Sequence, residues 1–306
     1  MRGVRIFYTD QFVLPLPPGH RFPMEKYQLL REAVAAPDGV PGARLEVPAP
    51  TSDEELRLVH TPEYLGAVLA GTLERRAARA IGFPWSPGMV ERSRRSVGAT
   101  VAAARAALDD GAGANLAGGT HHAFPDRGGG FCVFNDVAVA TRILQREGRV
   151  GRVSVLDLDV HQGDGTAAIF RDDPSVFTVS VHGGANYPFR KQRSDLDIPL
   201  EDRAGDEVFL PAVERAVEAA AEEGRPDLLF YIAGADPHEG DRLGRLAVTR
   251  EALAWRDERV VAMCRRRGIP VAVVMGGGYG RDIRDTVAIH LASVRAVAGI
   301  VGWPAV

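Results

Sequence analysis

The stretch 154-SVLDLDVHQGDGTAAIF-170 decides how the fold is interpreted. It begins like the buried strand of a parallel sheet and then places Asp157, Asp159 and His161 where further apolar residues would be expected. Side chains at positions i and i+2 of a strand point to the same face, so these three line up together. An unpaired buried carboxylate is strongly unfavourable, so this strand must end at a site that compensates its charges.

Outward from this stretch, short aliphatic or β-branched runs alternate with helical patterns. This alternation predicts an α/β fold with one mainly parallel, doubly wound sheet flanked by helices. No repeat or linker divides the chain, so we expect a single domain over residues 1–306. The predicted strands are Val4–Tyr8, Ala114–Ala117, Val153–Leu158, Val176–Val181, Leu228–Ala233 and Val271–Met275. The predicted helices are Met24–Ala35, Asp53–Ala70, Met89–Asp109, Asn135–Glu147, Asp206–Glu223, Arg250–Arg267 and Ile283–Ala298.

Composition limits the classes of function that fit. The chain is 45% hydrophobic and 25% charged, as in an ordinary soluble globular protein. A net charge of -3 gives no electrostatic reason to expect nucleic acid or an anionic membrane as a partner. Cys132 and Cys264 are too far apart in sequence to suggest a disulfide scaffold or a cysteine zinc site. No signal peptide or membrane-spanning run is evident, so we expect a cytoplasmic protein.

Polar side chains follow several of the predicted strands. His121 and His122 follow one strand, Asp236 follows another, and Tyr279 lies within GGGYG after a third. Ligands bind beyond the carboxyl ends of the strands in open α/β sheets, so we expect these groups to gather at one crevice. No G-x-G-x-x-G motif follows the first strand and no phosphate-binding loop is present, so a nucleotide site is disfavoured.

The strand-end residues favour a metal site. Asp159 and His161 can bind one cation together, Asp236 can supply a third ligand, and Asp157 lies behind them. Two carboxylates and one imidazole, without a thiolate, suit Zn²⁺ or Fe²⁺ with an open position for water and substrate. The alternative is that Asp157 and Asp159 are helix caps or members of a salt bridge.

The paired histidines have carboxylates available to orient them. Asp157 and Asp164 are candidate partners for His121 and His122, and a histidine held by a carboxylate is a common general acid or base. Tyr279 is flanked by glycines that let its loop approach a ligand, and its phenol could donate to an oxyanion. Taken singly, a histidine pair is more often hydrogen-bonded packing, and the tyrosine could be an ordinary turn aromatic.

Four blocks resemble those of the zinc-dependent histone deacetylases, which have the arginase–deacetylase fold. The blocks are GGTHHAFPDRGGGFCVFNDVAVA, LDLDVHQGDGTAAIF, AGADPHEGDRLG and GGGYG, and the likeness spans roughly residues 3–300. HRFPMEKYQLL and DRGGGFC look most similar to the class IV branch and its bacterial relatives. Arginases use two metals and an Asp-x-His-x-Asp pattern, so the Asp-x-Asp-x-His order here disfavours a urea-forming enzyme.

The resemblance implies a role for each motif residue. Zinc would be held by Asp159, His161 and Asp236, and His122 would be the main acid and base beside His121. Asp157 and Asp164 would orient the two histidines, and Tyr279 would polarise the scissile carbonyl. The acyl-lysine tunnel would be lined by Gly130, Phe131, Tyr187 and Leu243. A structural K⁺ would be bound through Asp157, Asp159, Ser180 and the carbonyls of His161 and Val181.

The implied activity is zinc-dependent hydrolysis of acyl groups, acetyl or longer, from lysine side chains of proteins. Two departures concern the substrate: 81-IGFPWSPGMV-90 lacks the acidic rim residue of many members, and only Lys26 or Arg21 could replace the arginine of the family's acid-release cavity. A deacetylase of small acylated amines such as acetylpolyamines and a non-catalytic binding protein remain alternatives. The class IV likeness implies a preference for longer acyl groups, and the missing rim carboxylate predicts poor use of acetylated polyamines.

Overall fold

Eight strands form one parallel sheet in the computed structural model, which describes residues 3–300. The strand order is β2-β1-β3-β8-β7-β4-β5-β6, and every neighbouring pair is parallel. The mainly parallel, doubly wound sheet predicted from the sequence is confirmed. The strands are β1 (Arg5–Phe7), β2 (Arg44–Glu46), β3 (Ala112–Asn115), β4 (Val153–Asp157), β5 (Val176–Gly183), β6 (Leu196–Leu200), β7 (Leu228–Ala233) and β8 (Val271–Met275).

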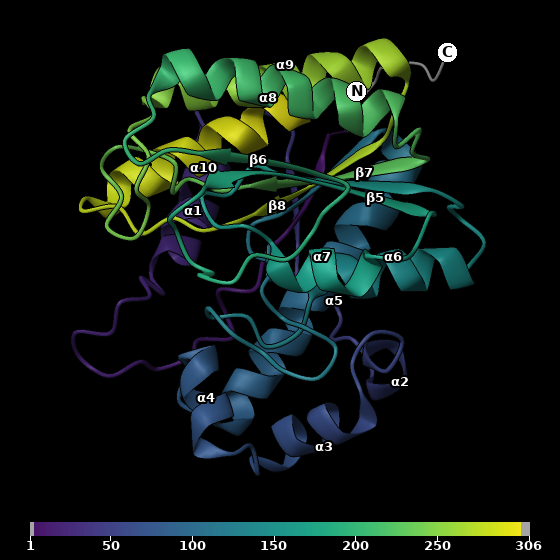
Figure 1. The fold of residues 1–306 in the computed structure, drawn as a ribbon, viewed down its shortest axis with the longest axis vertical. Helices are drawn as coiled ribbons and strands as arrows, with labels where there is room; N and C mark the ends of the chain where they lie inside the picture. The colour runs from purple at the N-terminus through teal and green to yellow at the C-terminus, as the bar shows by residue number, and fades with distance from the viewer. Residues whose placement is uncertain (1–2, 301–306) are drawn as a thin grey trace.

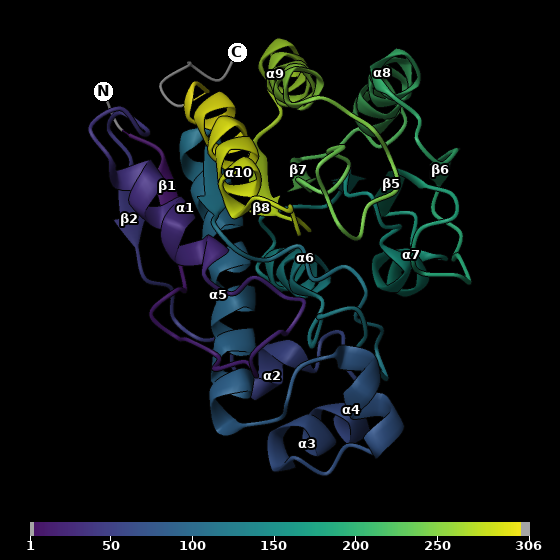
Figure 2. The ribbon, with the colours of Figure 1, turned by 90° about the vertical axis from the view of Figure 1, so that its left-hand side faces the viewer.

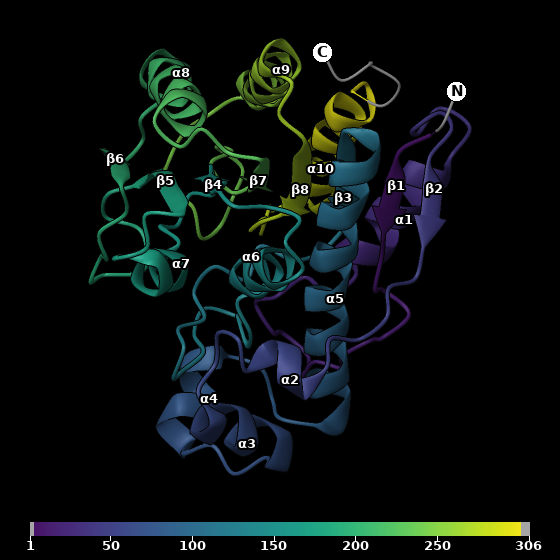
Figure 3. The same cartoon turned by 90° about the vertical axis from the view of Figure 1, so that its right-hand side faces the viewer.

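Helices cover both faces of the sheet. In Figure 1, α8, α9 and α10 lie above it, and α5, α6 and α7 lie below, while α1 packs against α10. Figures 2 and 3 show α5 running from the sheet to a separate group formed by α2, α3 and α4. The helices are α1 (Lys26–Ala35), α2 (Asp53–Leu56), α3 (Pro62–Ala70), α4 (Arg75–Ile81), α5 (Pro87–Asp110), α6 (Asp136–Arg146), α7 (Asp164–Phe170), α8 (Asp206–Glu222), α9 (Arg250–Arg267) and α10 (Ile283–Ala298).

The central strands are apolar because both of their faces are covered. Every residue of β4, β7 and β8 is buried, as expected for parallel strands between two helical layers. The edge strands β2 and β6 are short and mostly half-exposed, and β6 contains Pro199. The prediction missed both, because neither carries a continuous apolar run.

The prediction of one continuous helix over residues 53–70 is wrong, because the chain forms two separate helices there. Ser52 and Glu55 form the reciprocal capping box at the start of α2. Thr61 then caps α3, and Pro62 occupies its first turn, where a missing N–H is tolerated. The short helices α4 and α7 were not predicted, while the boundaries of the other predicted elements agree within two residues.

The sheet order explains how distant parts of the chain meet. Strands β3, β8, β7 and β4 are consecutive neighbours, so the loops after them share one edge of the sheet. In the register, Asp157 lies opposite Ile232 of β7, and Ile232 lies opposite Val274 of β8. The segments that carry the histidines, the aspartates and the tyrosine therefore leave the sheet side by side.

Candidate active site

Asp159, His161 and Asp236 form a buried cluster at the ends of β4 and β7. His161 Nδ1 lies 3.0 Å from Asp159 Oδ1 and 3.1 Å from Asp236 Oδ2. One potential ligand atom from each residue falls within 4.8 Å of the others. Asp236 Oδ2 is buried and accepts no well-aligned hydrogen bond from residues 3–300. An unsatisfied buried carboxylate oxygen beside two other donors is the arrangement that a cation would complete.

The electrostatics of this cluster also fit a cation. Burial and the negative charge of Asp159 raise the pKa of Asp236 to about 7. Burial opposes protonation of His161, but hydrogen bonds to Asp159 and Asp236 raise its pKa to about 10. Two carboxylates this close repel each other, and a divalent ion would relieve that repulsion. The donor set of two carboxylates and one imidazole fits Zn²⁺ or Fe²⁺.

Backbone groups fix the ligand carboxylates. The amides of His161 and Gly277 donate to Asp159, and the amide of Val160 donates to Asp236 Oδ1 at 3.0 Å. Position 277 requires glycine because a Cβ there would lie 1.8 Å from Asp236 Oδ2. The loop after β8 thus packs directly against the carboxylates presented by β4 and β7.

Each tandem histidine is paired with a carboxylate. His121 Nδ1 donates to Asp157 Oδ2, and His122 Nδ1 donates to Asp164 Oδ1, both at 2.7 Å. The two rings lie 4.1 Å apart between centroids. Their loop is held by Asp136, the first residue of α6, whose carboxylate accepts from the amide of Thr120 at 2.8 Å. These are the pairings that the family resemblance implied.

The histidines differ in charge. Burial lowers the pKa of His122 to about 4, and the positive charge of His121 lowers it further against the opposing effect of Asp164. Burial also disfavours protonated His121, but the negative charges of Asp157 and Asp159 raise its pKa to about 9. His122 is therefore neutral at neutral pH, with Nε2 free to accept a proton, while His121 carries the charge.

Tyr279 lies in the loop after β8. Burial raises the pKa of its phenol well above the usual value, so the hydroxyl stays protonated and can donate a hydrogen bond. Asp241 positions this residue, because its Oδ2 accepts from the amide of Tyr279 at 2.6 Å. The other oxygen of Asp241 accepts from the amides of Leu243 and Gly244 at 2.8 and 2.9 Å.

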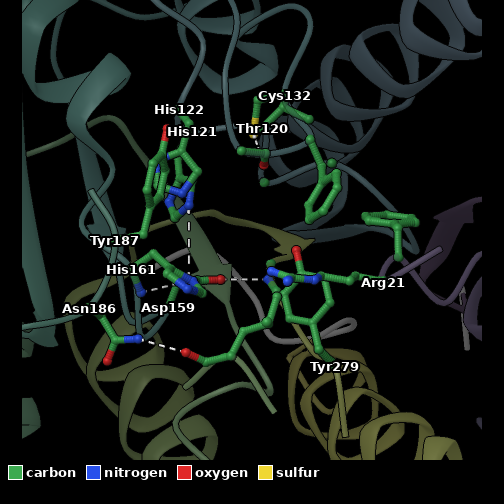
Figure 4. Close-up of a pocket in the computed structure, with 18 of the residues that line it drawn as sticks. Arg21, Thr120, His121, His122, Cys132, Asp159, His161, Asn186, Tyr187 and Tyr279 are labelled. Atoms are coloured by element: carbon green, nitrogen blue, oxygen red, sulfur yellow. Dashed lines mark hydrogen bonds and ion pairs between the residues drawn. The ribbon is translucent and has the colours of Figure 1, made fainter. Parts of the chain in front are cut away.

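Both tandem histidines, the ligands Asp159 and His161, and Tyr279 line one cavity of about 570 Å³. Figure 4 shows His121, His122, Asp159, His161 and Tyr279 converging on it. The residues expected to line an acyl-lysine tunnel all border the same cavity: Gly130, Phe131, Tyr187 and Leu243. The Tyr187 ring packs edge-on against His122, with centroids 4.9 Å apart.

Comparison with known proteins identifies the family. A model of the histone deacetylase domain matches residues 20–294. The chain belongs to the histone deacetylase family. It is 45% identical, over 97% of its length and 99% of the relative, to an uncharacterized protein of Picosynechococcus sp..

Two further relatives of this histone deacetylase family member have descriptive names. Histone deacetylase 2 of Arabidopsis thaliana is 30% identical over 79% of the chain and 65% of that protein. The acetoin utilization protein AcuC of Bacillus subtilis is 35% identical over 73% of the chain and 62% of that protein. The matched segment thus spans less than two thirds of these two relatives.

A solved structure shares the fold of this family member. The HD domain of HDA15 superimposes with a TM-score of 0.79 over 97% of the chain and 91% of that domain, at 22% identity. This agreement confirms the arginase–deacetylase fold. Within residues 3–300, no helix is long and apolar enough to cross a membrane.

The residues proposed to bind K⁺ lie behind the ligand cluster of this family member. Asp157 and Ser180 are register partners on β4 and β5. Ser180 Oγ is hydrogen-bonded to His182 Nδ1 at 3.0 Å, and Val181 is buried. The strands bring these residues together with the segment that contains Asp159 and His161, and the ion itself stays a prediction.

A buried ion pair beneath the ligand loops escaped the sequence analysis. Arg256 of α9 donates to the carbonyl of Gly234 at 2.6 Å and to that of Leu158 at 3.4 Å, next to the ligand segments. Its partner Asp257 accepts from Tyr231 and Ser293. A signal was present, since both charges fall on the helix face that otherwise carries Leu253, Val260 and Cys264.

Proposed function

We propose that this protein is a metal-dependent amidohydrolase that removes acyl groups from lysine side chains of proteins. The observation that carries the proposal is the convergence of the Asp159–His161–Asp236 cluster, two histidine–carboxylate pairs and Tyr279 on one cavity. Membership of the histone deacetylase family supports the same chemistry. A non-catalytic binding role would leave this complete set of reactive groups without a use.

Asp159, His161 and Asp236 would hold the ion. When bound, Zn²⁺ or Fe²⁺ supplies Lewis acidity that polarises the amide carbonyl and lowers the pKa of water. Neutral His122 accepts a proton from the attacking water at Nε2, because its Nδ1 is held by Asp164. His121 is charged and hydrogen-bonded to Asp157, and its ring packs beside the ring of His122 and helps to hold that ring in place.

Tyr279 acts on the carbonyl oxygen. Its protonated hydroxyl donates a hydrogen bond as negative charge develops on that oxygen. His122 then returns its proton to the leaving nitrogen as the C–N bond breaks. Water has supplied the hydroxyl of the acid and the proton of the amine, so the products are a carboxylic acid and a lysine side chain.

The charge of the cavity favours acyl-lysine over acylated polyamines. Among residues 3–300, its lining contains four lysine and arginine side chains besides charged His121, and a single carboxylate, which belongs to the ligand Asp159. A polyamine retains positive charges after acylation, and the cavity would repel them. An acyl-lysine side chain is neutral and aliphatic, and the rings of Phe131 and Tyr187 suit its stem.

A direct comparison of substrates tests the proposal. The zinc-loaded protein should hydrolyse an acetyl-lysine peptide with higher kcat/KM than acetylspermidine, and a chelator should abolish the reaction. A preference for acetylspermidine would support the small-amine alternative. Failure of the metal-loaded protein to hydrolyse either substrate would favour a binding role. Class IV affinity, cytoplasmic location, Zn²⁺ or Fe²⁺ as the bound metal and the structural K⁺ belong to the same proposal.

A further inference from the structure

Two buried cations border the cavity without a carboxylate partner. Lys26, the first residue of α1, is 3% exposed, and Arg92 of α5 is 8% exposed. Within residues 3–300, neither side chain forms an ion pair. Lys26 Nζ donates to the carbonyl of Gly278 at 3.3 Å. Buried charges are normally paired, so a pair of cations facing a cavity indicates a missing anion.

Aromatic rings, rather than carboxylates, surround these cations. Lys26 Nζ lies 5.2 Å from the Tyr279 centroid and 5.3 Å from those of Phe22 and Tyr27. Arg92 Cζ lies 4.8 Å from the Tyr27 centroid. Ring faces attract cations, yet a guanidinium has five N–H donors that need acceptor atoms. A carboxylate would supply them in a matching bidentate geometry.

The position of these cations relative to the reacting centre identifies what could reach them. The open end of the cavity is marked by Tyr187 and by Phe189, which is 86% exposed. Lys26 and Arg92 are buried and both contact the Tyr27 ring, and Lys26 Nζ also lies 5.2 Å from the Tyr279 centroid. A lysine stem that enters from the open end and places its carbonyl beside Tyr279 therefore brings its acyl group next to Lys26.

We propose that Lys26 and Arg92 form a carboxylate subsite for acyl groups that end in a carboxylate, such as succinyl or glutaryl. This inference rests on the proposed function and specifies its substrate class. Hydrolysis would break the amide C–N bond, with water supplying the hydroxyl of a dicarboxylic acid and the proton of the released amine. An equally long hydrocarbon acyl chain would cover both cations without accepting hydrogen bonds from their N–H groups.

Matched peptides test the subsite. We would measure kcat/KM of the zinc-loaded protein on one peptide with acetyl-, succinyl-, glutaryl-, octanoyl- or succinamoyl-lysine. Succinamoyl is the neutral isostere of succinyl. Succinyl or glutaryl should exceed succinamoyl and octanoyl by at least about tenfold, the effect of a charge-assisted hydrogen-bonded pair. A preference for octanoyl or succinamoyl would overturn the inference.

Arg92→Gln and Lys26→Met assign the effect to the two cations. Each should lower the ratio of succinyl to succinamoyl kcat/KM by about tenfold. Arg105→Gln is the matched control, since Arg105 lies on the same helix and pairs with Glu147 at the surface. An unchanged ratio in both variants would refute the subsite. Hydrolysis of acetyl-lysine without the succinyl preference would reject this inference alone, whereas no hydrolysis of any peptide would reject the proposed function.

Discussion

Buried charges are paired differently in two parts of the cavity: the reacting end, which holds the histidines, and the inner end, which holds Lys26 and Arg92. At the reacting end, His121 and His122 each meet a carboxylate at 2.7 Å. At the inner end, Lys26 and Arg92 contact aromatic rings and pair with no carboxylate of the described residues 3–300. The two histidine–carboxylate pairs are complete within the protein and prepare the imidazoles for chemistry, whereas the two inner cations would be paired only by a ligand. A buried charge that lacks a partner therefore indicates where the substrate supplies one.

The largest expected effect tests whether the reacting end needs its cation. Asp236→Ala should reduce bound metal from about one ion per chain to almost none. Loss of Lewis-acid catalysis should lower kcat/KM on acetyl-lysine peptide by at least about 10³-fold. Elemental analysis of the purified protein measures the metal, and Glu222→Ala, at an exposed carboxylate, is the control. Two ions per chain, or unchanged metal in Asp236→Ala, would contradict the assignment of the three ligands.

Removal of the acid–base group should have the next largest effect. His122→Ala should retain the metal but lower kcat by about 10²- to 10⁴-fold, because the attacking water loses its proton acceptor. Steady-state kinetics together with metal analysis separate this effect from loss of the ion. Parent-like turnover in His122→Ala would show that the reacting end does not operate through this histidine.

Tyr279 tests the oxyanion contact. Tyr279→Phe keeps the ring that borders the inner cations and removes only the hydroxyl. We expect kcat to fall by roughly 10²- to 10³-fold, with metal content and folding unaffected. Tyr64→Phe provides the comparison, because it removes a buried hydrogen bond to the Val133 carbonyl away from the cavity. Equal kinetic losses in the two variants would mean that the Tyr279 hydroxyl has no special role.

The smallest effect concerns stability and distinguishes paired from unpaired cations. Arg92→Met removes a buried charge without a partner, so the free energy of unfolding should rise by about 0.5–2 kcal/mol. Arg256→Met should change it in the opposite direction, since Asp257 would stay buried without its partner. Denaturant unfolding of both variants measures the difference. Destabilisation by Arg92→Met would show that the inner end is already satisfied within the protein.

The reacting end was largely predictable from the sequence, whereas the inner end was not. Asp157, Asp159 and His161 follow one another at strand spacing, so their shared face could be read directly. Lys26 was identified only as a possible substitute for a family arginine, and Arg92 was not identified. Their common position depends on how α1 and α5 pack around the sheet, and no local pattern encodes that packing.

Similar reasons explain the elements that were missed. The strands β2 and β6 lie at the two edges of the sheet. An edge strand has a neighbour on one side only and is less buried, so its sequence lacks a continuous apolar run. Helix α7 is short, and its sequence continues the motif that begins with the aspartates, so its residues were assigned to the site rather than to a helix. The Arg256–Asp257 ion pair was missed because both charged residues lie on a helix face that is otherwise apolar.

The order of strands in the sheet also determines when the site can exist during synthesis. The first three strands and the next three form two groups, and β7 and β8, the last to be made, lie between them. The inner edge of β4 stays open until β7 has left the ribosome, and the edges of β3 and β7 stay open until β8 follows; open edges are templates for incorrect pairing and binding surfaces for chaperones.

Asp236 and Tyr279 arrive with these two final strands. A chain that stops before β8 therefore has neither a complete sheet nor the tyrosine of the site. Completion of the sheet and completion of the reactive centre are one event in the biogenesis of this protein, and prematurely terminated copies carry an incomplete centre.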